Sequence, residues 1–87
     1  MSGGTFTIED LKRIMHEAAG TDDSLDGENL DTDFAALGYD SLALLETGGR
    51  IEREYGISLD DDTVISAGTP GALIAEVNAR LTPSQAL

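Results

Sequence analysis

Ser41 is the residue of this chain whose position most clearly suggests chemistry. It stands in the segment GYDSLALLE, residues 38–46, between a glycine turn and an apolar run with helical spacing. A hydroxyl at the first turn of a helix lies beside backbone N–H groups without intrahelical partners, and a phosphate ester there would meet the positive end of the helix dipole. The alternative is that Asp40 or Ser41 only caps the helix. The pattern therefore leaves two roles open, a phosphorylated attachment site and an ordinary cap.

An activated nucleophile is a poor match for Ser41. A nucleophilic serine needs a positioned base, and the single histidine, His16, falls in a different predicted helix among charged and small residues. That setting indicates a surface or half-buried histidine. The chain has no cysteine, which excludes a thiol nucleophile and a disulfide framework. A domain of 87 residues also offers little room for an oxyanion hole and a substrate cleft, so we expect a protein without catalytic residues.

The charge balance restricts the partners. There are 17 acidic residues against 5 Lys and Arg, a net charge of −12. Such a surface repels nucleic acid and anionic lipid, attracts basic protein surfaces and favours a monomer, although the acidity could also serve solubility alone. No apolar run approaches a membrane span, and the N-terminus lacks the pattern of a secretory signal. We therefore expect a cytoplasmic protein that binds neither nucleic acid nor membrane.

A calcium-binding loop is the second chemical candidate. The segment DDSLDGENLDTD, residues 22–33, places acidic and polar residues near the ligand positions of an EF-hand. Asp33 stands where a bidentate glutamate is usual, and Asn29 stands where the inward apolar residue is expected. The helix that would follow is interrupted at once by Gly38. We therefore predict no specific metal site, and weak binding of divalent cations by the acidic cluster remains open.

The apolar spacing predicts an all-α fold, a small antiparallel bundle of three main helices plus one short helix, with a long ordered first loop. The main helices are predicted over 7–19, over 41–55 and from Pro70 onward, and the short one over 60–66. Residues 1–87 form a single domain, with 1–5 and 83–87 as flexible ends. In the loop, residues 31–37 are predicted to form a short helical turn. Four apolar residues are expected to anchor this loop on the core: Leu25, Leu30, Phe34 and Leu37.

The helix over 41–55 is expected to have two functional faces. An inward face carries Leu44, Gly48, Ile51 and Tyr55. On its exposed part, Leu42 and Leu45 lie beside acidic residues, including Glu46 and Glu52, which is typical of a small docking surface; ion pairs such as Glu46–Arg50 are the simpler explanation for the charges. The adjacent Gly48 and Gly49 cost about 1 kcal/mol each relative to alanine, and they allow either close helix packing or extra room in the core.

These residues together resemble the acyl carrier proteins. The segment GYDSLALLE is similar to the attachment motif of that family, a glycine followed by a short spacer and Asp-Ser-Leu. The likeness extends over nearly the whole chain, through Phe34 in the loop, REYGISL at the end of the second helix and the Thr-Pro start of the last. LGYDSLALLE together with TPGALIAEVNARL is most similar to the freestanding carriers of bacterial type II (aromatic) polyketide synthases. Gly48-Gly49 departs from the family, in which alanine or larger residues are more common.

The resemblance implies a cofactor and a set of partners. Ser41 would carry 4′-phosphopantetheine, transferred from coenzyme A by a phosphopantetheinyl transferase, and Asp40 would help to position the site for that enzyme. The arm would supply the thiol that the chain lacks and hold malonyl and growing polyketide chains as thioesters. Leu42 and Leu45 would contact partner enzymes, and Glu46 and Glu52 would meet their basic patches.

The implied partners are a ketosynthase/chain-length factor, a malonyl transferase, a ketoreductase and an aromatase/cyclase. Two alternatives stay open, a fatty acid carrier and an acidic interaction module without a prosthetic group. If a bound chain enters the bundle, we expect it near Leu44, Gly48 and Val64.

Overall fold

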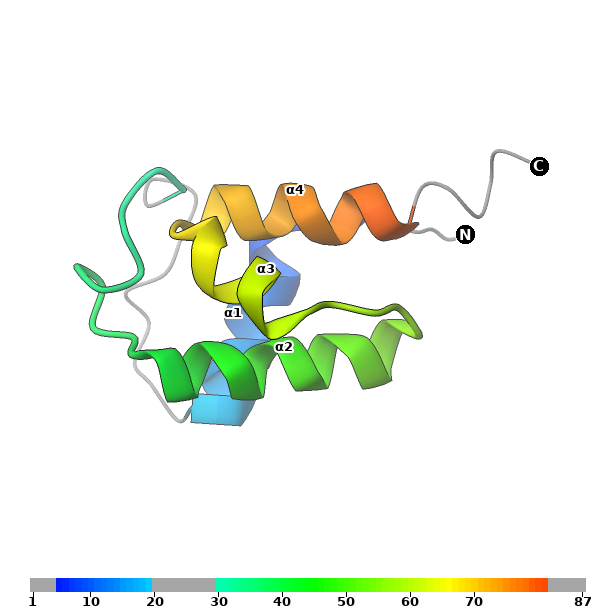
Figure 1. Ribbon diagram of the computed structural model, residues 1–87, viewed down its shortest axis with the longest axis horizontal. Helices are drawn as coiled ribbons and strands as arrows, with labels where there is room; N and C mark the ends of the chain where they lie inside the picture. The colour runs from blue at the N-terminus through cyan, green and yellow to red at the C-terminus, as the bar shows by residue number, and fades with distance from the viewer. Residues whose placement is uncertain (1–4, 20–29, 82–87) are drawn as a thin grey trace.

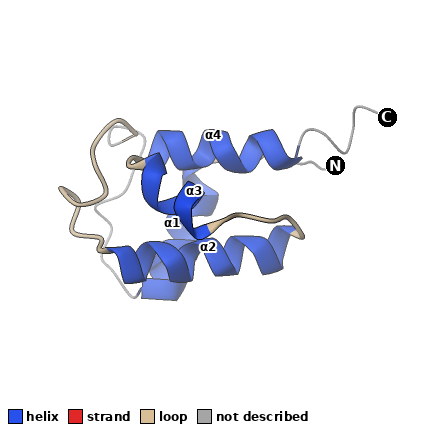
Figure 2. Ribbon diagram, in the orientation of Figure 1, coloured by secondary structure: helices blue, strands red, loops and turns tan. Residues whose placement is uncertain are grey.

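The computed structural model describes residues 5–19 and 30–81, and in these ranges it contains helices and no strand. The helices are α1 (Ile8–Ala19), α2 (Ser41–Tyr55), α3 (Asp61–Ala67) and α4 (Pro70–Leu81) (Figures 1 and 2). The predicted all-α fold with three longer helices and one short helix is confirmed. The bounds of α1 and α3 differ from the prediction by one residue because Thr7 and Asp60 occupy the cap positions. None of the helices described is long and apolar enough to cross a membrane.

Side-chain caps explain where the longer helices begin. The Oγ1 of Thr7 accepts a hydrogen bond from the backbone N–H of Asp10 at 3.3 Å, and the Asp10 carboxylate accepts one from the N–H of Thr7 at 3.1 Å. Thr69 Oγ1 likewise accepts from the N–H of Ala72 at 3.2 Å at the start of α4. These bonds satisfy donors that a helix terminus leaves without partners. Thr7 and Thr69 are therefore the caps of α1 and α4.

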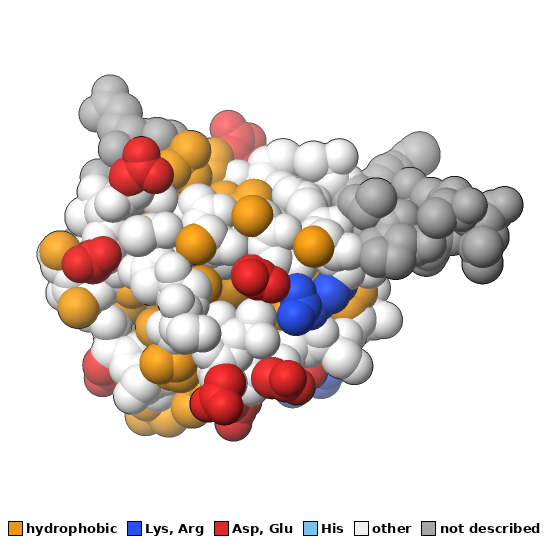
Figure 3. All heavy atoms as spheres, turned by 45° about the horizontal axis from the view of Figure 1, so that its top comes forward, with side chains coloured by type: hydrophobic (Ala, Val, Ile, Leu, Met, Phe, Trp, Pro, Cys, Tyr) orange, Lys and Arg blue, Asp and Glu red, His pale blue; other side chains and the backbone are white. Residues whose placement is uncertain are grey.

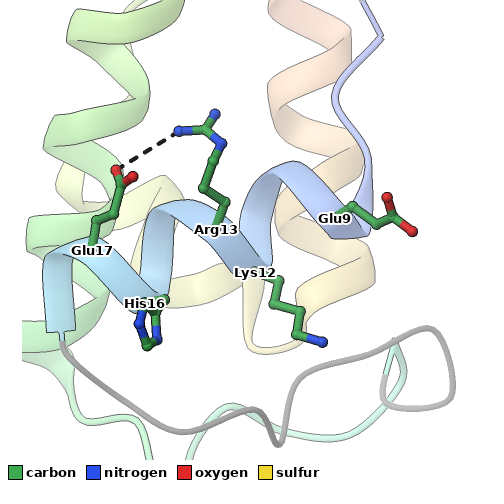
Figure 4. Close-up of a pocket in the computed structure, with 5 residues that line it drawn as sticks. All are labelled: Glu9, Lys12, Arg13, His16 and Glu17. Carbon is green, nitrogen blue, oxygen red and sulfur yellow. Dashed lines mark ion pairs between the residues drawn. The ribbon is translucent and has the colours of Figure 1, made fainter.

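The helices enclose the core in a closed cycle. Both α1 and α3 pack against α2 and against α4. α2 and α4 run in the same direction, and α1 crosses them steeply (Figures 1 and 4). The segment after α2 returns the chain to α3, so that α4 begins near the end of the molecule where α2 begins (Figure 1).

The core formed by the described residues is mainly apolar, and Thr47 brings a polar side chain into it. Thr47 is fully buried, and its Oγ1 donates a hydrogen bond to the Ala43 carbonyl at 2.8 Å, which removes the cost of burying it. The expected inward face of α2 is confirmed, with Tyr55 only partly buried. Ile14 and Thr47 are core residues that were not predicted from the sequence. The buried hydrophobic residues are Phe6, Leu11, Ile14, Met15, Phe34, Tyr39, Leu44, Ile51, Leu59, Val64, Leu73 and Val77.

Residues 30–40 form an ordered loop that is bonded to the junction of α3 and α4. The N–H of Phe34 donates to the Gly68 carbonyl at 2.8 Å, and the N–H of Gly71 donates to the Leu30 carbonyl at 2.9 Å. Phe34 is buried and Leu37 packs against the core, as predicted for these anchors, whereas Leu25 lies outside the described residues. The short helical turn predicted over 31–37 is present slightly later in the chain, over 34–38, where the N–H of Leu37 donates to the Asp33 carbonyl and the N–H of Gly38 donates to the Ala35 carbonyl, both at 3.1 Å.

Gly48 lies where Val64 of α3 packs closely against α2. A Cβ atom on Gly48 would lie 2.9 Å from Val64 Cγ2, closer than carbon atoms pack. Of the two explanations for the glycine pair, close packing is therefore correct at Gly48, and the expectation of extra room for a bound chain near Gly48 and Val64 is wrong. A Cβ on Gly49 would meet only Arg53 Nη1, at 3.7 Å.

The two adjacent glycines offer a matched stability test. Gly49→Ala is expected to raise the free energy of unfolding by about 0.5–1 kcal/mol, because it adds helix propensity without a clash. Gly48→Ala is expected to be at least about 1 kcal/mol less stable than Gly49→Ala, because its new methyl group must displace Val64. Urea denaturation followed by circular dichroism measures both. Equal stabilities would show that α3 does not pack tightly on Gly48.

Candidate functional site

Ser41 and Asp40 have separate roles at the start of α2. Asp40 is the cap: its backbone is extended (φ −95°, ψ 179°) and its Oδ1 accepts a hydrogen bond from the N–H of Ala43 at 2.9 Å. Ser41 is the first residue of the helix and is exposed. Its hydroxyl makes no hydrogen bond with the described parts of the chain. Of the two candidates for the cap, Asp40 is therefore the one that caps the helix. The Ser41 oxygen is available for esterification at a helix N-terminus.

A buried aromatic pair fixes the position of this serine. Tyr39 is 4% exposed, and its ring meets the edge of Phe34 at a centroid distance of 6.0 Å. The N–H of Tyr39 also donates to the Phe34 carbonyl at 3.0 Å. Gly38, with φ of 94°, takes the left-handed conformation that lets the chain turn into this contact. The backbone therefore enters α2 from a fixed point two residues before Ser41.

An open groove of about 410 Å³ lies beside Ser41. Its apolar walls include Phe34 and Leu44, together with Ile65 of α3. Ile65 is 40% exposed. Its place beside the serine could not be predicted from spacing, because a seven-residue helix is too short to show a clear inner and outer face. The full lining is Asp33, Phe34, Ala35, Tyr39, Asp40, Ser41, Leu44, Ile65 and Gly68. A flexible apolar chain attached to Ser41 could lie in this groove.

The predicted docking residues occupy the first half of α2 and the space beside it. Leu42 is 65% exposed, which makes it more exposed than Ile65, the other large hydrophobic residue exposed in the described ranges. Glu46 is exposed, and Leu45 is half-buried, so the expectation that Leu45 is exposed is only partly met. Glu46 makes no ion pair within residues 5–19 and 30–81, and Arg50 lies 3.7 Å from Glu17 of α1 instead. The predicted Glu46–Arg50 pair is therefore wrong.

Glu52, also predicted to meet partners, has a structural contact. It is half-buried, and its Oε2 accepts a hydrogen bond from the backbone N–H of Leu59 at 2.8 Å. This bond ties the end of α2 to the segment that leads into α3. Glu52 is thus less suited than Glu46 to bind a partner. On the face of the molecule that Figure 3 shows, acidic groups are spread over the surface with apolar side chains exposed between them.

A second surface pocket, of about 380 Å³, runs along α1 and contains the histidine (Figure 4). Within it Arg13 pairs with Glu17 at 3.7 Å and also reaches Glu54 of α2 at 2.5 Å. The hydrogen bond to Glu54 raises the pKa of Arg13 above its usual value. His16 lines this pocket and is absent from the lining of the groove beside Ser41, so the structure does not bring the histidine to the serine.

Metal ligation has no support in the described ranges. Residues 5–19 and 30–81 contain no group of three His, Cys, Asp or Glu side chains that could hold a metal ion. Most of the segment considered as a calcium loop, residues 22–33, lies outside the described residues. Weak cation binding by that loop stays a prediction.

Comparison with known proteins identifies a close set of relatives. Residues 9–77 match the protein family described as "Phosphopantetheine attachment site". The chain is 60% identical over 86 residues to the monensin polyketide synthase acyl carrier protein of Streptomyces virginiae, covering 98% of each. It is 55% identical over 79 residues to the oxytetracycline polyketide synthase acyl carrier protein of Streptomyces rimosus, covering 88% of this chain and 83% of the relative.

The fold is similar to solved structures of such carriers. The actinorhodin carrier of Streptomyces coelicolor in its 3-oxo-butyl form matches with a TM-score of 0.84 at 40% identity, covering 95% of this chain and 99% of the other. The solution structure of the oxytetracycline acyl carrier protein matches with a TM-score of 0.80 at 51% identity, covering 94% and 88%.

Proposed function

We propose that this chain, which belongs to the phosphopantetheine-attachment family and within it to the acyl carrier proteins of type II polyketide synthases, bears its prosthetic group on Ser41. The protein is a carrier subunit and not an enzyme, and its cofactor is 4′-phosphopantetheine. The observation that supports the assignment is the exposed hydroxyl of Ser41, which makes no hydrogen bond with the residues that the structure describes, beside a cap made by Asp40. The two alternatives, a fatty acid carrier and a module without a prosthetic group, are set aside by the family assignment.

The carrier holds polyketide intermediates, and the thiol of the arm supplies the thioester bond that binds them. Relatives have been solved with 3-oxo-butyl and 3,5-dioxohexyl groups, which supports β-ketoacyl chains as the cargo of this protein. The groove lined by Phe34, Leu44 and Ile65 begins at Ser41 and suits the arm and the first atoms of such a chain. Gly48 and Val64 close the space deeper between α2 and α3, so the cargo is expected to stay in the open groove.

Delivery depends on docking to the enzymes of a synthase and to a phosphopantetheinyl transferase. For this chain we expect those enzymes to be a ketosynthase/chain-length factor, a malonyl transferase, a ketoreductase and an aromatase/cyclase. Leu42 offers an apolar contact beside the attachment point, with Leu45 at its edge, and Glu46 and Asp40 offer charge for basic patches. Steering by charge with a small apolar anchor gives fast and reversible association. We also expect a monomer, because copies of a chain with a net charge of −12 repel one another. Loading from coenzyme A is consistent with a location in the cytoplasm.

Leu42 and Glu46 provide a test of this docking surface. Leu42→Asp and Glu46→Arg are each expected to weaken binding to the ketosynthase about tenfold, because one removes the apolar anchor and the other reverses the steering charge. Both side chains are exposed, so the free energy of unfolding is expected to change by less than about 0.5 kcal/mol. Surface plasmon resonance with the phosphopantetheinylated carrier measures the affinity. Unchanged affinity in both variants would place docking elsewhere on the carrier.

A further inference from the structure

The exposed stripe of α2 continues beyond the proposed docking residues. Leu42, Glu46, Gly49 and Arg53 follow one another at helical spacing and share one face. Two hollows lie along this face. One, of about 210 Å³, is lined by Ala18, Asp40, Leu42, Ala43 and Glu46. The other, of about 420 Å³, is lined by Ala18, Leu45, Glu46, Gly49, Arg50 and Arg53. Because the hollows share Ala18 and Glu46, they form one continuous surface, which we call the α2 stripe.

The far half of the α2 stripe is basic, although the chain carries a net charge of −12. Arg50 lies 3.7 Å from Glu17 with its side chain 44% exposed, which makes it a weak ion pair at most. Arg53 is exposed and makes no ion pair with any residue in 5–19 or 30–81. Elsewhere arginines have close internal partners: Arg13 binds Glu54 at 2.5 Å, and Arg80 binds Glu76 at 2.7 Å.

Two features of the local sequence at this end cost helix stability, although Arg53, in the last turn, interacts favourably with the helix dipole. Arg50 and Arg53 are three residues apart on one helix, a spacing that places like charges together. Four residues before Arg53, where a glutamate would form a supporting pair, the chain has Gly49, which costs about 1 kcal/mol relative to alanine. Unlike Gly48, Gly49 is not required by packing, because a Cβ there would meet only the Arg53 side chain. Such a departure from local rules is expected at functional surfaces.

We propose that the hollow over Gly49, flanked by Arg50 and Arg53, receives carboxylate side chains of a synthase enzyme. The same enzyme would present basic groups to Asp40 and Glu46 near Ser41, so this inference rests on the docking function proposed above. With a rise of about 1.5 Å per residue, the arginines lie about 14–18 Å along the helix from Ser41. The α2 stripe is therefore acidic at one end and basic at the other, and this polarity fixes which way the carrier lies on its partner. A uniformly acidic helix would allow the reverse orientation as well.

The test is to reverse the charge of Arg53 and measure binding of the phosphopantetheinylated carrier to the ketosynthase/chain-length factor. Arg53→Glu is expected to lower the affinity about 3- to 10-fold. Lys12→Glu on α1 makes the same charge change away from the α2 stripe and is expected to leave the affinity within about twofold. Circular dichroism and loading by the transferase confirm that each variant is folded. Arg50→Glu is expected to behave like Arg53→Glu, with a smaller effect because Glu17 already screens Arg50.

The sign of the effect separates the possible outcomes. A uniformly basic partner surface would bind Arg53→Glu more tightly than the unaltered carrier, and tighter or equal binding overturns this inference. If Leu42→Asp and Glu46→Arg weaken binding while Arg53→Glu does not, only the basic end is rejected. If none of these variants weakens binding, docking through α2 is rejected as a whole.

Discussion

The Ser41→Ala protein is expected to keep its unmodified mass when it is incubated with coenzyme A and a promiscuous phosphopantetheinyl transferase, whereas the unaltered chain gains one phosphopantetheinyl group. The substitution removes the oxygen that forms the phosphodiester. The helix should be unaffected, because the cap bond to the N–H of Ala43 comes from Asp40. Intact-mass spectrometry measures the result directly, and the loss is expected to be complete.

Ser66→Ala is the matched control for this experiment. Ser66 is also an exposed serine, but it lies within α3 and its hydroxyl bonds to the Asp62 carbonyl of its own helix. The Ser66→Ala protein is expected to gain the same added mass as the unaltered chain. Added mass that persists in Ser41→Ala and disappears in another serine variant would show that the attachment point is misassigned.

Phe34→Ala is expected to destabilise the protein more than any exposed substitution. Phe34 is 2% exposed, and truncation of a buried phenylalanine costs about 3–5 kcal/mol. A domain of this size is stable by only about 5–15 kcal/mol. The ring also meets Tyr39 edge-on, and it anchors the segment whose backbone bonds to Gly68 through the N–H of Phe34. Urea denaturation should show a lower midpoint, and hydrogen exchange should show faster exchange over residues 30–40.

Two further variants limit the interpretation of that result. Phe34→Leu keeps an apolar side chain of intermediate size and is expected to lose less stability than Phe34→Ala. Leu42→Ala removes an exposed side chain and is expected to change the free energy of unfolding by less than about 0.5 kcal/mol. If Phe34→Ala unfolds at the same urea concentration as Leu42→Ala, the loop is not anchored through this ring.

Helix positions could be predicted well because their signals are local. Thr7, Thr69 and Gly56 mark helix termini through bonds formed within a few residues, and the structure shows those bonds. The inward face of α2 follows from spacing alone. Ser41 could also be singled out as the candidate for attachment, because its position before an apolar run is visible in the nine consecutive residues 38–46.

The features that were missed depend on contacts between distant segments. Whether Gly48 leaves a void or a close contact is decided by Val64, sixteen positions later, and the spacing of α2 contains no trace of it. Arg50 pairs with Glu17 of another helix, so the i, i+4 rule chose the wrong partner. Glu52 bonds the Leu59 backbone, which turned an expected surface charge into an internal contact. Spacing within one helix cannot show which neighbour a side chain meets.

The division of work between Asp40 and Ser41 has a consequence for how cargo status is recognised. Since the end of the helix is capped by the Asp40 carboxylate, esterifying the serine breaks no hydrogen bond among residues 5–19 and 30–81. The empty and the loaded scaffolds should then present the same outer shape to visiting enzymes. We therefore expect enzymes to distinguish a carrier with an acyl group from one without it by contacts with the prosthetic group and its cargo. An enzyme that contacted only the helical surface would have the same residence time on loaded and unloaded carriers.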